Sequence, residues 1–134
     1  MNKNSNMNGF TLIEIMITVS IILILSSIGV PIYRGYLDDA KINLAKQNLN
    51  SIYLAETDYF FENNEYYLSG SACGDHNTSI TNYLFQGQKI IGDDYFNFCI
   101  IPNNDGYKAK ASEISGNTEV SIDHLNNLTI NTTG

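Results

Sequence analysis

The sequence predicts an α+β fold, in which one long N-terminal α-helix packs on a small antiparallel sheet of three to four strands. Residues 10–63 hold a long apolar run that continues into a pattern of helical period. Residues 94–134 instead hold short runs of β-prone residues, separated by asparagine- and glycine-containing turns. The chain has 134 residues, so one small globular domain fits after the apolar segment.

The apolar run predicts a hydrophobic helix over residues 10–33. From Gly9 to Tyr33 the only ionisable carboxylate is Glu14, and the rest of the run is almost wholly apolar. At about 1.5 Å per residue, this helix is long enough for most of a hydrocarbon core of roughly 30 Å. A cleaved secretory signal fits this run poorly, because such signals usually have shorter apolar regions and carry no acid. An isolated carboxylate in lipid is costly, so Glu14 is expected to be functional and to have a partner; the alternative is an acid that snorkels to the membrane edge.

Gly29 and Pro31 interrupt the hydrophobic helix near its end. Proline lacks a backbone donor and clashes with the carbonyl four residues earlier, here that of Ser27. Glycine lowers the helix propensity further. We therefore expect a kink or a locally loosened turn at Gly29–Pro31.

The second half of the helix, residues 34–63, is amphipathic. We expect its apolar positions to face a sheet: Leu37, Ala40, Leu44, Leu49, Ile52, Ala55 and Tyr59. The polar positions between them should face solvent: Asp38, Asp39, Lys41, Lys46, Gln47 and Glu56. A freestanding coiled coil fits less well, because the repeat breaks at Asn48. Asn63-Asn64 should end the helix by turn chemistry, which gives a helix of roughly 80 Å from Phe10.

Residues 64–93 read as a connecting loop, with a short strand or helix near residues 80–85. Residues 94–134 predict a meander of strands at 95–101, 107–112, 119–123 and 128–130. Asn103-Asn104-Asp105-Gly106 is a strong turn signal between the first two strands. Cys73 and Cys99 are the only cysteines, and an even number in a small exported domain favours a disulfide over two free buried thiols.

The junction Gly9-Phe10-Thr11-Leu12-Ile13-Glu14, followed by the apolar run, resembles the class III signal of the type IV pilin family. Pro31, Tyr33 and Tyr36 also match the family pattern where the two halves of the helix meet. The resemblance implies a leader of residues 1–9, which a prepilin peptidase removes between Gly9 and Phe10 before the new amine is methylated. It further implies that the helix can unwind near Pro31, although Leu23 stands where many members have glycine. Subunit contacts are then expected in the connecting loop, at Tyr66, Tyr67 and His76.

Physical chemistry is consistent with these roles. Glycine before the scissile bond has no Cβ, so a peptidase can approach the backbone closely. The free amine of Phe10 would lie one helical turn from Glu14, and the two charges can pair within a subunit or with a neighbour. Pairing with a neighbour would set the register of docking.

No residue set points to catalysis, so we do not expect an enzyme, a cofactor or a metal. His76 and His124 are isolated and expected at the surface, and the cysteines lack CxxC spacing. Oxygen ligands at Asp93-Asp94 and Asn103–Asp105 allow a calcium site, with ordinary turns as the alternative. The net charge of −7 makes nucleic acid an unlikely partner, although the lysines on one predicted face would bind phosphate weakly: Lys89, Lys108 and Lys110.

The sequence therefore predicts a structural subunit of a type IV pilus, with residues 34–134 as its soluble domain. As the resemblance implies, it would wait in the inner membrane as a single-pass protein and then join an extracellular filament used in adhesion, twitching motility or DNA uptake. Its partners would be other pilins, the prepilin peptidase, the assembly platform and the bilayer. The alternatives are a pseudopilin of a type II secretion system and a minor pilin that acts as a DNA receptor.

Overall fold

A computed structural model describes residues 9–92 and 94–132, which form two units divided between Asp38 and Asp39. The elements follow in the order α1 (Leu12–Asn63), α2 (Asn77–Leu84), β1 (Phe96–Asn103), β2 (Gly106–Glu113), β3 (Thr118–Asp123) and β4 (Leu128–Thr132). This confirms the α+β fold class predicted from the sequence.

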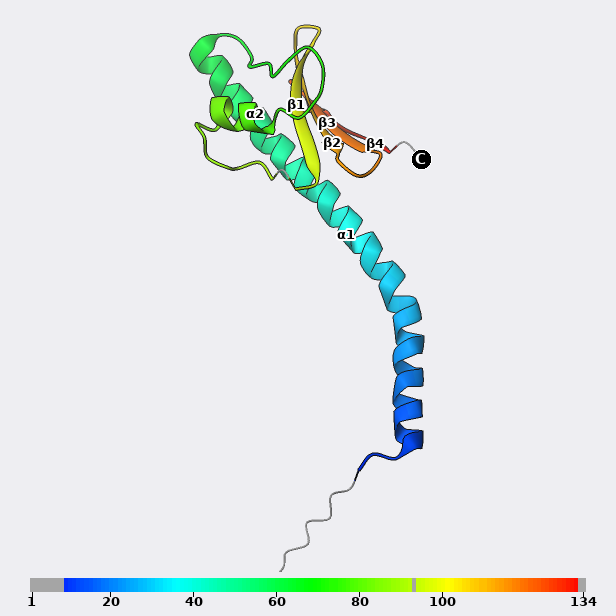
Figure 1. Ribbon diagram of the computed structural model, residues 1–134. Helices are drawn as coiled ribbons and strands as arrows, with labels where there is room; N and C mark the ends of the chain where they lie inside the picture. The colour runs from blue at the N-terminus through cyan, green and yellow to red at the C-terminus, as the bar shows by residue number, and fades with distance from the viewer. Residues whose placement is uncertain (1–8, 93, 133–134) are drawn as a thin grey trace, which may run out of the picture. The chain divides into compact units, whose positions relative to one another are not determined.

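The strands form one antiparallel sheet in the order β1-β2-β3-β4, which is the predicted meander (Figure 1). A two-residue loop joins β1 to β2, with Asn103 opposite Gly106 and Asn104 in the left-handed region at φ 45°. A Cβ at Gly106 would collide with the His124 ring, so only glycine fits this close approach.

The core of the second unit lies between one face of the sheet and the part of α1 after Asp38. Alternate residues of β2 point toward the helix: Tyr107, Ala109 and Ala111 are buried. Ala45, Leu49 and Ile52 complete the core from the helix side. Ile80 of α2 also belongs to this core, and α2 packs beside β1 (Figure 1).

The predicted apolar stripe of α1 is correct at Leu49 and Ile52 and partly buried at Ala55 and Tyr59, but its first three positions are exposed: Leu37, Ala40 and Leu44. Leu44 is 38% exposed, while Ala45 is fully buried, because the buried face follows residues 45, 49, 52 and 56 at helical spacing. Asn48 and Glu56 are also buried, although both are polar and Glu56 was predicted to face solvent. The helix face that packs on the sheet therefore could not be predicted from the hydrophobicity of its residues alone.

Both ends of α1 are set by local chemistry. The helix begins at Leu12 rather than at the predicted Phe10, because the Thr11 side chain caps it. It ends at Asn63 as predicted, and Asn64 takes the left-handed conformation at φ 58° while its amide donates to the Phe60 carbonyl at 2.8 Å. Pro31 lies inside α1, so the Ser27 carbonyl lacks its usual backbone donor. The kink at Gly29–Pro31 stays a prediction.

Candidate functional site

The start of α1 is held by reciprocal hydrogen bonds between Thr11 and Glu14. The Glu14 amide donates to Thr11 Oγ1 at 3.3 Å, and the Thr11 amide donates to Glu14 Oε2 at 2.8 Å. The Thr11 hydroxyl also donates to Glu14 Oε2, at 2.9 Å. This arrangement is a capping box, in which each residue satisfies a backbone donor that the first helical turn would otherwise leave free.

The capping box gives Glu14 a partner that the sequence analysis missed. The signal for it was a threonine three residues before a glutamate at the start of an apolar run. Cleavage between Gly9 and Phe10 would leave the Phe10–Thr11 peptide bond intact, so the Thr11 amide would still hold the carboxylate. Only Oε2 takes part in these bonds, which leaves Oε1 available for a charged partner.

Gly9 and Phe10 precede the helix and are exposed, with Phe10 at 85%. A Cβ added at Gly9 would meet nothing within 4 Å. The backbone on both sides of the predicted cleavage point is therefore accessible in this unit. The predicted leader, residues 1–9, lies outside the described residues except for Gly9.

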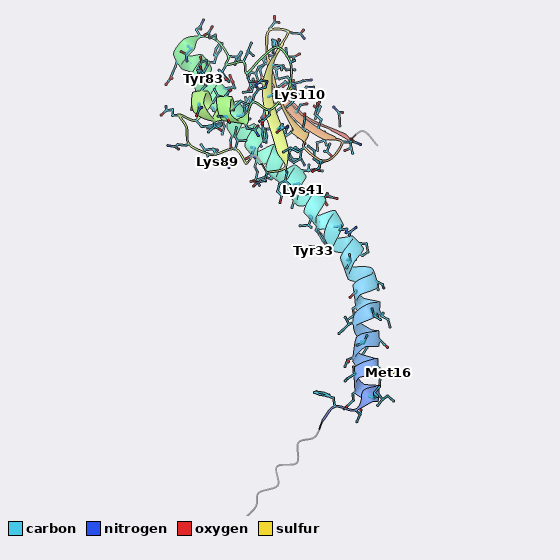
Figure 2. The ribbon with its side chains drawn as sticks, viewed as in Figure 1. Met16, Tyr33, Lys41, Tyr83, Lys89 and Lys110 are labelled. Carbon is cyan, nitrogen blue, oxygen red and sulfur yellow. A yellow bond between two sulfur atoms is a disulfide. The ribbon has the colours of Figure 1, made fainter. Side chains whose placement is uncertain are left out.

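The apolar part of α1 is fully exposed in this isolated chain. α1 includes a segment that is long and apolar enough, by length and composition, to cross a membrane. Along one face, the small side chains of Ser26 and Gly29 leave a shallow hollow between larger neighbours: Ile22, Leu25, Val30, Tyr33, Arg34 and Leu37. Figure 2 shows Met16 and Tyr33 projecting from this part of the helix. Such a surface is stable only against lipid or other apolar helices.

The predicted disulfide between Cys73 and Cys99 is present, with the two Cα atoms 5.3 Å apart. It ties the segment after α1 to β1. Ser69 reinforces this attachment, because its amide donates to the Ile100 carbonyl at 2.9 Å and its hydroxyl accepts from the Ile100 amide at 2.8 Å. Asn77 does the same: Oδ1 accepts from the Phe98 amide at 2.7 Å, and Nδ2 donates to the Phe96 carbonyl at 3.2 Å. The outer edge of β1 is thereby covered.

The loop residues predicted to make subunit contacts are partly used inside the unit. Tyr66 stacks on Phe60, with ring centroids 4.6 Å apart, and Tyr67 stacks on Tyr83 of α2 at 5.1 Å. Tyr66 and Tyr67 are half-buried. The rings therefore fix the loop to α1 and α2 before any second subunit is considered.

Both histidines were expected at the surface, and both are half-buried there. His76 directly precedes α2, and its amide donates to the Phe98 carbonyl at 3.2 Å. His124 follows β3, and its ring lies 6.4 Å from the Tyr66 ring. Neither lies in a group that could hold a metal, because the described residues contain no cluster of three or more metal-ligating side chains.

The predicted lysine face is partly neutralised by acids. Lys110 makes an ion pair with Glu119 at 3.0 Å, and Lys108 stands opposite Asp123 in the β2–β3 register. Lys110 comes from the sheet, whereas Lys89 comes from the segment after α2 (Figure 2). Of the possible calcium ligands, Asp93 lies outside the described residues. Asn104 and Asp105 form the β1–β2 turn.

Comparison with known proteins defines the class of the N-terminal segment. Residues 4–30 match the family model described as the prokaryotic N-terminal methylation motif. The chain thus carries the methylation motif of prepilin-type proteins, and the resemblance seen in the sequence is confirmed.

The similar proteins include two curated relatives. The type IV major pilin protein PilA of Myxococcus xanthus (strain DK1622) is 41% identical over 63 residues, which cover 47% of this chain and 29% of the relative. The prepilin peptidase-dependent protein D of Escherichia coli (strain K12) is 56% identical over 34 residues, which cover 25% of this chain and 23% of the relative. The aligned stretches thus span less than a third of either relative. No solved structure matches the chain.

Proposed function

We propose that this chain is a structural subunit of a type IV pilus and not an enzyme. The observation that carries the proposal is the N-terminal segment: an accessible Gly9–Phe10 bond, a capped helix start that holds Glu14, and an apolar helix with every side chain exposed. A helix that is apolar all round must be buried against lipid or other helices. A filament core built from such helices offers that environment outside the membrane.

The proposed life of the subunit has two stages. Before assembly, residues 10–33 span the inner membrane and residues 34–134 form the exported domain. A prepilin peptidase then removes residues 1–9 and methylates Phe10, and an assembly platform moves the helix into an extracellular filament. The disulfide supports an exported domain, because such bonds persist in oxidising compartments.

Glu14 has a specific role in this scheme. Its Oε2 is held by Thr11, so the carboxylate is oriented before a partner arrives. The methylated amine of Phe10, in the same or a neighbouring subunit, supplies the positive charge. In an apolar core this pair is stronger than in water, and an unpaired carboxylate would be heavily penalised.

A pseudopilin of a type II secretion system is the main alternative, since it would carry the same N-terminal motif. The disulfide favours the pilus subunit, because the resemblance associates major pseudopilins with bound calcium instead. A DNA-receptor pilin is less favoured, since the chain is acidic and Lys110 is already paired. Metal content of the purified protein and a gel shift at low salt distinguish these alternatives.

Co-expression with a prepilin peptidase tests the proposal directly. Intact-mass spectrometry should find a chain that begins at Phe10 and carries one methyl group. A Gly9→Val variant should stay uncut, because a branched side chain obstructs the approach to the bond. A Gly35→Ala variant is the matched control, since Gly35 lies inside the helix with no neighbour within 4 Å, and it should be processed normally. Surface filaments that retain residues 1–9 would refute the assignment.

A further inference from the structure

The second unit holds a carboxyl group that the proposed function does not use. Glu56 lies on the core face of α1 and is fully buried, one turn after Ile52. A buried glutamate without an ionic partner is rare, because removing a charge from water costs several kcal/mol. Its surroundings therefore decide whether it carries a charge.

One hydrogen bond connects Glu56 to the segment after the helix. Its Oε2 accepts from the Tyr67 amide at 3.0 Å, across 11 residues of chain. Its Oε1 and the buried Tyr107 hydroxyl have no hydrogen-bond partner among the described residues. The titratable groups of the surrounding elements are phenols, one acid and one imidazole: Tyr53 and Tyr59 of α1, Tyr66 and Tyr67 of the following segment, Tyr83 of α2, Tyr107 of β2, Asp123 of β3 and His124 directly after β3. Within the described residues, none of these groups makes an ion pair with Glu56, and its one hydrogen bond comes from the neutral Tyr67 amide.

This environment favours the neutral acid. Burial raises the pKa of Glu56 to about 8, and the hydrogen bond from the Tyr67 amide opposes this only in part. The carboxyl is therefore protonated in the closed structure at neutral pH. Ionisation inside the cluster would leave a buried negative charge with one neutral donor and, among the described residues, no ion pair.

We propose that Glu56 is a proton-dependent latch, which holds the 64–69 segment against α1 while its carboxyl is neutral and releases it on ionisation. The aromatic contacts of the segment would be lost with it, because Tyr66 packs on Phe60 and Tyr67 packs on Tyr59 and Tyr83. Tyr66 and Tyr107 also line a pocket of about 250 Å³, so water has space beside the cluster once Tyr66 moves. At the C-terminal end of the segment, Ser69 stays hydrogen-bonded to β1, and the Cys73–Cys99 bond holds the residues that follow.

The sign of the pH dependence follows from the two states. In the closed state the pKa is about 8, and in the open state it returns toward the ordinary value of 4.5. The closed state therefore binds more protons between these values. The closed state is therefore most favoured below pH 4.5. Between pH 4.5 and about 8 the opening constant rises, by up to about tenfold per pH unit. Above that range the dependence levels off.

Amide hydrogen exchange of the full chain in detergent micelles tests the latch. The opening constant for the Tyr67 amide, which donates to Glu56, is corrected for intrinsic exchange and measured from about pH 5 to 9. In the wild type it should rise steeply and then level off. In Glu56→Gln it should vary little, because the amide keeps the acceptor for Tyr67 but does not ionise. Glu62→Gln, at an exposed position of the same helix, should behave as the wild type.

Equal pH dependence in the wild type and Glu56→Gln would overturn the latch, as would a flat wild-type opening constant. If Glu56→Gln does not fold, the latch is tested on the wild type alone. Carbon-detected NMR of the Glu56 carboxyl should then show a titration near pH 8, and a titration at the ordinary glutamate value would refute the proposal. These outcomes do not depend on filament assembly, so the latch and the proposed function fail or succeed separately.

Discussion

Two glutamates of the same helix show how the environment decides the chemistry of a residue. Glu14 is exposed in the isolated chain and takes three hydrogen bonds with Thr11, two of them to one carboxylate oxygen. Glu56 is fully buried and takes one bond from a backbone amide. Glu14 is therefore oriented so that its carboxylate can pair with a positive charge, whereas Glu56 is stable when its carboxyl is neutral.

The Tyr107 hydroxyl provides a test of the buried cluster at the level of one atom. Tyr107 is 1% exposed, its hydroxyl has no hydrogen-bond partner in the part of the chain that the structure describes, and burial raises the pKa of its phenol. Tyr107→Phe removes only this hydroxyl. We expect urea unfolding to give a stability equal to the wild type or greater by up to about 1 kcal/mol, because an unsatisfied buried polar atom is removed.

Tyr83→Phe is the matched control, since Tyr83 is 66% exposed and should leave stability within about 0.5 kcal/mol. A loss of more than about 1 kcal/mol in Tyr107→Phe alone would mean that the hydroxyl has a partner in solution.

At the scale of elements, the sheet depends on the polar side chains that cover the edge of β1. Asn77 starts α2 and is 8% exposed, and its amide group pairs with the backbone of both Phe96 and Phe98. Asn77→Ala should cost about 2–3 kcal/mol in urea unfolding, because two buried backbone groups lose their partners. Thr78→Ala is the control, since Thr78 is exposed and neighbours Asn77 in the same helix. Equal stability of the two variants would contradict this role for Asn77.

The disulfide should contribute to the same attachment. Cys73 and Cys99 are 26 residues apart. Closing a loop of that length lowers the entropy of the unfolded chain, which stabilises the folded state by roughly 3–4 kcal/mol in the chain-entropy estimate. Replacing both cysteines with alanine should lower the melting temperature and speed amide exchange in residues 69–77. Exchange in the β2–β3 pair should change less, because that pairing does not involve the bridge. A double variant as stable as the wild type would show that Ser69 and Asn77 hold the edge without the bridge.

Elements with a strong local signal could be predicted from the sequence, and those that depend on tertiary contacts could not. The hydrophobic helix, its end at Asn63 and the four-stranded meander follow from periodicity and turn residues. The buried face of α1 did not, because Asn48 and Glu56 are polar residues placed inward by the sheet. The function of Asn77 was also hidden, since its partners lie in β1, about 20 residues away.

The candidate N-terminal site could be proposed from the sequence because its residues are adjacent in the chain. Gly9, Phe10 and Glu14 were identified from one short stretch. Thr11 was missed although its spacing from Glu14 is that of a capping box. The spacing of Thr11 and Glu14 was thus visible in the sequence, and the structure added the hydrogen bonds between them.

At the scale of the whole molecule, the two units have opposite requirements. The unit after Asp38 buries its own apolar side chains in one core. The unit up to Asp38 buries none among its described residues and needs other molecules to cover it. If this chain assembles as proposed, assembly should therefore depend on the first unit, and variants at Glu14 should affect filaments without unfolding the second unit.

Substitution of Glu14 tests this dependence and separates charge from capping. Glu14→Ala removes both the charge and the cap, whereas Glu14→Gln keeps an acceptor for the Thr11 amide, because glutamine also completes a capping box. Both variants should be processed and methylated normally, yet yield roughly tenfold fewer sheared filaments or less, since neither offers a charge to the Phe10 amine. Ser20→Ala is the control, because the Ser20 hydroxyl donates to the Met16 carbonyl of its own helix at 2.7 Å and takes no part in the hydrogen bonds between Thr11 and Glu14. Normal filament yield in Glu14→Gln but not in Glu14→Ala would mean that the cap, rather than the charge pair, is what assembly requires.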